Sequence, residues 1–213
     1  MAQALPKLVT FDEFIAWYPE NTEIRYELHN GVIIEMPKPR GQHGNVTGFL
    51  IEELVLTIIQ MGKRGIWTIP RESIVKSSSA KSGYEPDIIV LNQENIGSEP
   101  RWERESVIEN ASSVKLIVEV VSTNWRDDYH VKYADYEEMG IPEYWIVDYA
   151  ALGGRNFIGN PKQPTVFICQ LIDGEYQMTQ FRSHDLIVSP TFPQLNLTAQ
   201  QIFDAASLGA THN

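Results

Sequence analysis

The sequence predicts a mixed α/β fold in a single domain that spans residues 1–213. The predicted elements follow the order helix, strand, strand, strand, helix, strand, which is typical of a mixed sheet flanked by helices. Residues 114–122 and 143–148 carry apolar side chains on both faces, as the central strands of a covered sheet do. With 213 residues, 43% of them hydrophobic, the chain is long enough to bury one sizeable core.

The N-terminal part, residues 10–36, is expected to form a short helix and a β-hairpin as an extension of the core. Thr10 followed by Glu13 matches a capping box, which predicts the start of a helix. Asn30–Gly31 joins two extended runs and is a strong signal for a two-residue hairpin turn. Residues 37–44 are predicted to form a loop.

The core is expected to cover about residues 43–150 and to contain a long helix near its start. Apolar residues recur at near-helical spacing over residues 45–62, and a glycine ends the pattern. Residues 65–76 are predicted to form a strand interrupted by a proline, and residues 86–92 a second, short strand.

Three further segments complete the chain. Residues 93–106 are predicted to form an exposed polar loop, and residues 126–140 a helix that ends at a glycine. In the C-terminal part, residues 165–206, Asp173–Gly174 predicts a hairpin and Thr198 begins a short capped helix.

Composition and charge restrict the class of protein. The formal net charge of −11 argues against a broad electrostatic grip on nucleic acid, although a few divalent ions in an acidic cleft reverse the local field. The single Cys169 is expected to be a core residue, which agrees with a reducing, cytoplasmic setting. The first residues do not match a secretory signal, and no apolar run approaches the roughly 20 residues that span a bilayer, so no membrane contact is expected.

Two acidic residues adjoin apolar strands. Glu119 lies in the middle of an apolar strand, where an ionised carboxylate is costly unless a cation or hydrogen-bond donors meet it. Asp87 directly precedes the apolar run of residues 88–91. If the two strands are neighbours they lie about 4.8 Å apart, and the two acids can then share one Mg²⁺ or Mn²⁺. Such an ion binds a phosphate oxygen and generates hydroxide for in-line attack.

These residues carry a resemblance to a known family. Pro86–Asp87, then Glu119 within "VEVVS", then a helix and "EYWIVD", resemble the PD-(D/E)XK restriction-endonuclease-like superfamily. More closely, "RYELHNGVIIEM", "PDIIVL" and "VEVVSTNWRDDYHVKYADYEEMGIPEYWIVD" are similar to a large bacterial family of restriction-endonuclease-like proteins of unknown function. The resemblance covers about residues 10–150. It implies a restriction-endonuclease-like core, a metal-dependent endonuclease activity on DNA with Asp87 and Glu119 as metal ligands, and a homodimer.

The chain departs from the superfamily pattern at one catalytic position. The residue two after the acid is usually a lysine that polarises the attacking water, and here it is Val121. The resemblance suggests a replacement from the following helix, and Lys132 is the candidate. The other interpretation of Lys132 is an ordinary helix-surface pair with Asp128, worth only about 0.2–0.5 kcal/mol.

Two further site candidates have equally simple alternatives. Glu27 resembles a family-pattern position and is a candidate third catalytic acid, or else part of a salt bridge on the face of the hairpin. His43 is a candidate for contacting phosphate or the leaving group, or else a hydrogen-bonding residue at the start of a helix. Asp87 in turn could be a solvated turn residue, and Glu119 a strand-end carboxylate tied to a cation or backbone donors.

The resulting prediction is a divalent-metal-dependent endonuclease that hydrolyses phosphodiester bonds in DNA, with Asp87, Glu119, Lys132 and Glu27 as catalytic residues. The alternative is a nuclease fold retained as a non-catalytic module for dimerisation or protein binding. Val121 and the acidic composition favour this alternative. No phosphate-binding P-loop, serine-nucleophile elbow or zinc-spaced Cys/His cluster is present in the sequence, which disfavours those chemistries.

Overall fold

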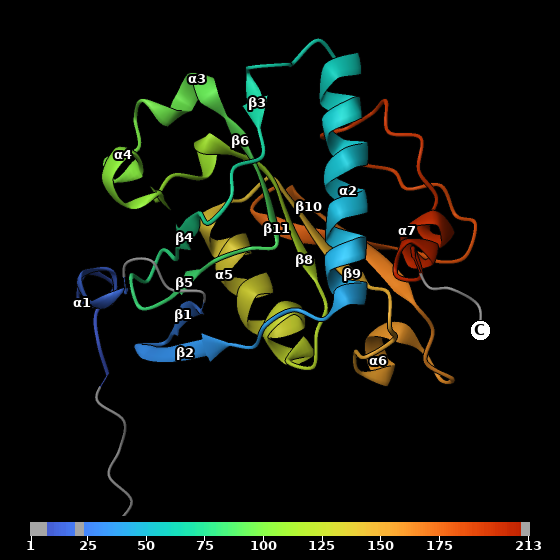
Figure 1. The fold of residues 1–213 in the computed structure, drawn as a ribbon, viewed down its shortest axis with the longest axis horizontal. Coiled ribbons are helices and arrows are strands. Elements are labelled where there is room, and N and C mark those ends of the chain that lie inside the picture. The colour runs from blue at the N-terminus through green and yellow to red at the C-terminus, as the bar shows by residue number, and fades with distance from the viewer. Residues whose placement is uncertain (1–7, 20–23, 210–213) are drawn as a thin grey trace, which may run out of the picture.

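The computed structural model describes residues 8–19 and 24–209 and shows two β-sheets with helices around them (Figure 1). Residues 1–7, 20–23 and 210–213, which the predicted domain includes, lie outside the described residues. The mixed α/β class predicted from the sequence is confirmed. Among the described helices, none has the length and apolar character needed to cross a bilayer.

The larger sheet is mixed and has six strands. Within the described part of the chain, its one parallel pair is formed by the two central strands that the sequence predicted. In sheet order the strands are β11 (Glu175–Phe181), β10 (Thr165–Ile172), β9 (Glu143–Asp148), β8 (Val114–Val120), β6 (Ile88–Asn92) and β3 (Trp67–Thr68).

A second sheet of five short strands lies beside the first, on the side of the molecule opposite α2 and α7 (Figure 1). In sheet order its strands are β2 (Val32–Met36), β1 (Arg25–His29), β5 (Gly83–Tyr84), β4 (Ile74–Lys76) and β7 (Val107–Ile108). The predicted N-terminal hairpin forms one edge of this second sheet. Three strands of this second sheet, β4, β5 and β7, have only two or three residues, which is too few to leave a period-two pattern in the sequence.

The helices of the described residues are α1 (Phe11–Trp17), α2 (Gly41–Gln60), α3 (Gln93–Ile96), α4 (Trp102–Glu105), α5 (Lys132–Met139), α6 (Arg155–Ile158) and α7 (Ala199–Ala205). Helices α2 and α7 pack on one face of the larger sheet and α5 on the other, whereas α1 packs on the smaller sheet. A short 3₁₀ segment, η1 (Ala111–Ser113), precedes β8, and a π-helical turn, η2 (Asp127–Val131), leads into α5.

Side chains on the two faces of β8 enter two different apolar clusters. On one face, Leu116, Val118 and Val120 pack with buried residues of α2 and α7. On the other face, Ile117 and the following Val121 pack with aromatic residues of η2 and α5. The strand is therefore buried on both faces, as its sequence predicted.

The local signals in the sequence correspond to observed elements. Both capping boxes form, both two-residue hairpin turns form, and the helix of residues 126–140 ends at a glycine with positive φ. The residues concerned are Thr10 with Glu13, Thr198 with Gln201, Asn30–Gly31, Asp173–Gly174 and Gly140.

The first long helix begins at Gly41, so the prediction of a loop over residues 37–44 is wrong in its second half. Arg40 occupies the N-cap position without a side-chain cap hydrogen bond, and the helix start therefore has no capping signal in the sequence. His43 lies in the first turn of α2, where its Nε2 is 2.9 Å from the carbonyl oxygen of Val120. A tertiary contact supports this helix start in place of a local cap.

Two other predictions for local structure are corrected. Residues 65–76 are divided between β3 in one sheet and β4 in the other. Residues 93–106 are not an exposed loop, because they include α3 and α4 with Glu99 buried between them. The Glu99 carboxylate accepts hydrogen bonds from the backbone N–H groups of Glu109 (2.9 Å) and Asn110 (3.2 Å). The prediction failed because the hydrogen-bond donors that satisfy Glu99 come from a later segment. From the sequence alone, such a glutamate cannot be told from an exposed one.

Candidate active site

The two predicted acids come from adjacent strands. β6 pairs antiparallel with β8, with Ile88 opposite Val118, and continuing this register by one residue places Asp87 opposite Glu119. The backbone N–H of Val120 donates a hydrogen bond of 2.9 Å to Asp87 Oδ2. The condition set by the sequence analysis, that these two strands are neighbours, is therefore met.

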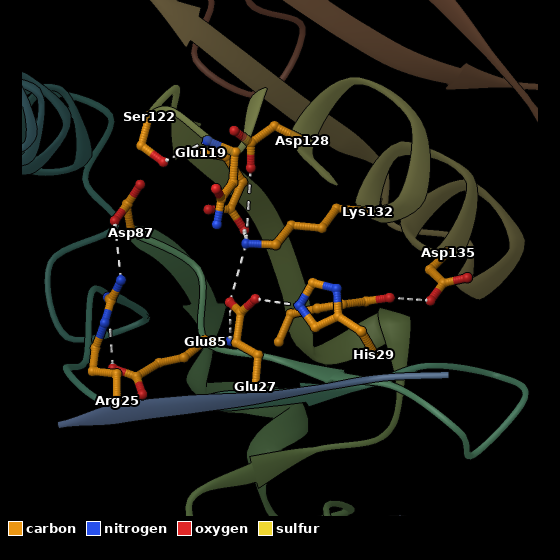
Figure 2. Close-up of polar contacts among 12 residues, drawn as sticks. Arg25, Glu27, His29, Glu85, Asp87, Glu119, Ser122, Asp128, Lys132 and Asp135 are labelled. Carbon is orange, nitrogen blue, oxygen red and sulfur yellow. Dashed lines mark hydrogen bonds and ion pairs between the residues drawn. The ribbon is translucent and has the colours of Figure 1, made fainter. Parts of the chain in front are cut away.

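A buried lysine meets Glu119. Lys132 Nζ lies 3.0 Å from Glu119 Oε1 and 3.0 Å from Glu27 Oε1, and the Lys132 side chain is only 4% exposed (Figure 2). Tyr136 donates a hydrogen bond of 3.1 Å to the same Glu119 oxygen. The carboxylate in the apolar strand is thus neutralised by a cation and a hydroxyl donor, both from α5.

Val121, which replaces the motif lysine, and Lys132 lie on the same face of the larger sheet. Val121 lies two residues after Glu119 and therefore points to the same face, the one that η2 and α5 cover. Val121 is 1% exposed and packs in the apolar cluster there. Lys132 belongs to α5, which covers this face, and its side chain reaches Glu119 from there. Asp128 Oδ1 is 3.9 Å from Lys132 Nζ, but both side chains are buried, so the interpretation as a helix-surface pair is wrong.

Glu27 belongs to this cluster and is fully buried. Its Oε2 is 2.8 Å from His29 Nε2, and its Oε1 accepts a hydrogen bond of 3.2 Å from the backbone N–H of Glu85 as well as the contact with Lys132. Burial raises the pKa of Glu27, but the charge of Lys132 and the hydrogen bond from His29 outweigh burial and lower this pKa to about 2. Glu27 is therefore ionised, and it links the N-terminal hairpin to α5.

Glu119 shares the same lysine but has the opposite shift. Burial raises the pKa of Glu119, Lys132 offsets only part of this effect, and the negative charges of Asp87 and Glu27 raise it further, to about 7. The pKa of Lys132 lies well above its ordinary value, because Glu119, Glu27 and Asp128 together outweigh the effect of its burial. Lys132 is therefore a permanent cation and a hydrogen-bond donor.

Asp87 is held by groups other than Lys132. Its Oδ2 accepts from Val120 N and lies 3.2 Å from His43 Nε2, while its Oδ1 faces the guanidinium of Arg25 at 3.8 Å. His43 Nε2 also lies 2.9 Å from the carbonyl oxygen of Val120, so this nitrogen carries the proton. Burial lowers the pKa of His43, but Asp87 and the Val120 carbonyl oxygen outweigh burial and raise it. His43 is positioned as the predicted hydrogen-bonding residue at a helix start, and it contacts Asp87.

The structure adds two residues that the sequence interpretation missed. Arg25 lies two residues before Glu27, and Glu85 two residues before Asp87, so each points to the same side of its strand or extended segment as a predicted site residue. Arg25 and Glu85 form an ion pair of 3.7 Å at the edge of the cluster (Figure 2). This alternation with Glu27 and Asp87 was the signal in the sequence that could have indicated Arg25 and Glu85 as site residues.

Comparisons with known proteins identify the family of the chain. A protein-family model described as "Uma2: Putative restriction endonuclease" matches residues 11–200. The chain belongs to the Uma2 family. None of the curated proteins matches the chain.

A solved structure shares the fold of this Uma2 member. It is a crystal structure from Anabaena variabilis, described as a putative nuclease belonging to DUF820, with 20% sequence identity and a TM-score of 0.70. The match covers 93% of this chain and 99% of that chain. At this level of identity the likeness shows a common fold, which is the restriction-endonuclease-like fold that the sequence motifs implied.

Restriction-endonuclease-like families generally use divalent metal ions, and the donors in this Uma2 site fit one. Among the described residues no group of three or more His, Cys, Asp or Glu side chains could hold a metal ion. Mg²⁺ needs only one or two carboxylates, because water fills its other positions. Asp87 Oδ1 and Glu119 Oε2 accept no hydrogen bond from any described residue, so each acid has an oxygen available for such an ion.

The charge balance of the cluster also suits a cation. Five carboxylates converge within it, and among the residues that the structure describes they face two permanent cations, Lys132 and Arg25, besides two histidines. The five carboxylates belong to Glu27, Glu85, Asp87, Glu119 and Asp128.

Proposed function

We propose that the chain is a divalent-metal-dependent endonuclease that hydrolyses phosphodiester bonds in DNA. One observation carries the proposal: Lys132 Nζ lies 3.0 Å from Glu119, and Glu119 lies opposite Asp87 on the neighbouring strand. Two acids and a lysine therefore converge although the motif lysine is absent from the strand. Membership of the Uma2 family and the nuclease-like fold support this assignment.

Asp87 and Glu119 would hold Mg²⁺ or Mn²⁺. When bound, such an ion supplies Lewis-acid activation of a phosphate oxygen and a hydroxide nucleophile at neutral pH. Lys132 is permanently charged, so it serves as a donor that orients the attacking water or stabilises developing negative charge, and it cannot serve as a general base at neutral pH. Glu27 fixes the position of Lys132, and Tyr136 fixes Glu119. His43 steadies Asp87 through its contact with Oδ2.

The experiment is duplex DNA cleavage by purified protein in Mg²⁺, in Mn²⁺ and in EDTA. We expect Asp87→Asn and Lys132→Met each to lower the cleavage rate by about 100-fold or more, as the loss of a single charge-stabilising group typically does. Asp173→Asn is the matched control, because it makes the same acid-to-amide change in a hairpin turn remote from the site, where asparagine suits the positive φ. Equal cleavage by all four proteins would reveal a contaminating nuclease and defeat the proposal. Single-stranded RNA as a second substrate distinguishes a DNA enzyme from an RNA enzyme.

The non-catalytic alternative, a module for dimerisation or protein binding, has one structural observation in its favour. Val55, Leu56 and Ile59 on α2 are 39%, 48% and 48% exposed and lie on one side of the helix. Light scattering after size exclusion tests the predicted homodimer, with Leu56→Glu as the variant expected to separate it. Calorimetry with Mn²⁺ discriminates the two functions, because a binding module has no need to hold a metal ion.

A further inference from the structure

Arg25 is the cation at the open edge of the acidic cluster. It comes from β1, and its side chain is 32% exposed, compared with 4% for Lys132. Figure 2 shows its guanidinium between Asp87 and Glu85, away from the contacts of Lys132. Of the two permanent cations in the cluster, Arg25 is therefore the one that a ligand from solution reaches first.

The contacts of Arg25 are loose. Its Nη1 lies 3.7 Å from Glu85 Oε1 and its Nη2 3.8 Å from Asp87 Oδ1, whereas charge-assisted N–H···O hydrogen bonds are about 2.7–2.9 Å long. The guanidinium donates no hydrogen bond to any described residue. Four negative charges hold it electrostatically, and they raise its pKa although burial acts in the opposite direction. Its donors remain available to an oxyanion.

A planar guanidinium with free donors is the side chain best suited to a phosphate group. It presents parallel N–H donors that match two phosphate oxygens, and it stays charged at every accessible pH. A phosphodiester bound beside Asp87 would offer Arg25 shorter and straighter hydrogen bonds than either carboxylate does in this structure.

Arg25 also faces the oxygen of Asp87 that is free to bind a metal ion. Asp87 Oδ2 is engaged by Val120 N and His43, so Oδ1 is the oxygen left, and Arg25 is the cation that faces it. A divalent ion that approaches Oδ1 meets the positive charge of the guanidinium. Without DNA, the positive charge of Arg25 therefore repels a metal ion from Asp87 Oδ1 and weakens its binding.

We propose that Arg25 binds a DNA phosphate in this site. Without DNA, its guanidinium interacts electrostatically with Asp87 Oδ1, and it leaves this oxygen when it binds the phosphate. The inference rests on the proposed function and specifies its substrate contact. It follows that metal ion and DNA bind cooperatively, because the phosphate removes the cation that opposes the metal ion.

The test compares wild type with Arg25→Gln, Arg25→Lys and the control Arg101→Gln. Arg101 is also a partly exposed arginine, and it pairs with Asp12, Glu105 and Glu109, which are outside the site. Mn²⁺ affinity is measured by calorimetry without DNA, and the affinity for a labelled DNA duplex by fluorescence anisotropy in Ca²⁺. Thermal unfolding shows whether each variant is folded.

In Arg25→Gln we expect the two affinities to change in opposite directions. Mn²⁺ should bind about three- to tenfold more tightly, because a partly screened positive charge has been removed. The DNA duplex should bind about tenfold more weakly, because a charge-assisted phosphate contact is lost. In Arg25→Lys, which keeps the charge but not the paired donors, Mn²⁺ affinity should match wild type and DNA affinity should fall several-fold. Arg101→Gln should match wild type in both measurements.

An unchanged or weaker Mn²⁺ affinity in Arg25→Gln, or an unchanged DNA affinity, overturns the inference. If Arg25→Gln does not fold, the loss of DNA affinity in Arg25→Lys decides it. Cleavage measured in parallel separates this inference from the proposed function. Affinities that change in opposite directions in a protein that never cleaves would support the role of Arg25 and defeat the nuclease assignment. A cleaving wild type with no effect at Arg25 would do the reverse.

Discussion

Glu27 and Glu119 share one lysine, and replacing each of them by glutamine should have opposite effects on stability. Both side chains are buried, and both have an oxygen 3.0 Å from Lys132 Nζ. Glu27 also receives hydrogen bonds from His29 and from a backbone N–H, whereas Glu119 is repelled by Asp87. Between about pH 4.5 and pH 7, Glu27 is therefore more stable ionised and Glu119 more stable protonated.

The size of each effect follows from the pKa shifts. The pKa of Glu119 is about 7 in the folded protein and 4.5 ordinarily, so between these pH values the folded state keeps a proton that the unfolded state releases. Stability then falls by about 1.4 kcal/mol per pH unit as pH rises, about 3 kcal/mol in all. The pKa of Glu27 falls from 4.5 to about 2, so its ionised form contributes about 3 kcal/mol above pH 4.5 that is lost as pH falls towards 2.

Glu119→Gln should therefore raise the free energy of unfolding by about 3 kcal/mol at about pH 8, and the difference should shrink towards zero near pH 4.5. Glu27→Gln should lower the free energy of unfolding by about 3 kcal/mol at neutral pH, with a difference that narrows below pH 4.5. Urea unfolding followed by tryptophan fluorescence measures both, in EDTA so that no divalent ion changes the charge balance. The two variants are each other's control, because they make the same change beside the same lysine.

A Glu119→Gln protein that is less stable than wild type at about pH 8 would refute the reasoning. Such a result would mean that the attraction of Lys132 exceeds the cost of burying the carboxylate. Equal destabilisation by both variants would refute it as well, because the asymmetry between the two environments would then be absent.

Three further predictions concern Lys132 and the packing and capping of α1. Lys132→Met should lower the free energy of unfolding by about 3–5 kcal/mol at neutral pH, because it leaves buried carboxylates without their cation, and urea unfolding should show a smaller loss in acid. Gly83→Ala should cost about 1–3 kcal/mol in the same assay, because an added Cβ would lie 2.5 Å from Phe11 Cε2, and no loss would mean that α1 moves freely. Thr10→Ala should cost about 1 kcal/mol by removing the cap of α1, with Thr10→Ser, which keeps the hydroxyl, close to wild type in a thermal melt.

Some features could be predicted from the sequence because their signals are local. A capping box links residues three apart, a hairpin turn needs two particular residues, and strand burial appears as the polarity of successive side chains. Thr10 with Glu13, Asn30–Gly31 and the apolar run around Glu119 were therefore interpreted correctly. The sequence left open whether the strands of Asp87 and Glu119 are neighbours, and the structure shows that β6 pairs with β8.

Other features depend on how distant segments pack, and the sequence carries no local signal for them. His43 was placed in a loop, because the contact that holds it in a helix comes from Val120. Arg25 and Glu85 were missed although they alternate with Glu27 and Asp87, because alternation does not show that the two segments meet in one cluster. Lys132 was a candidate only through the family resemblance, since helical spacing alone favoured its pairing with Asp128.

The sequence by itself determined the two central buried strands, the hairpin turns, the capped helices and which acids adjoin apolar strands. Only the tertiary structure decided that Lys132 lies between Glu119 and Glu27, the latter 105 residues away along the chain. The physical reason is the distance along the chain over which each interaction acts. Caps, turns and alternation act over a few residues, whereas a buried charge is matched by whatever cation the packing of a helix on a sheet brings to it.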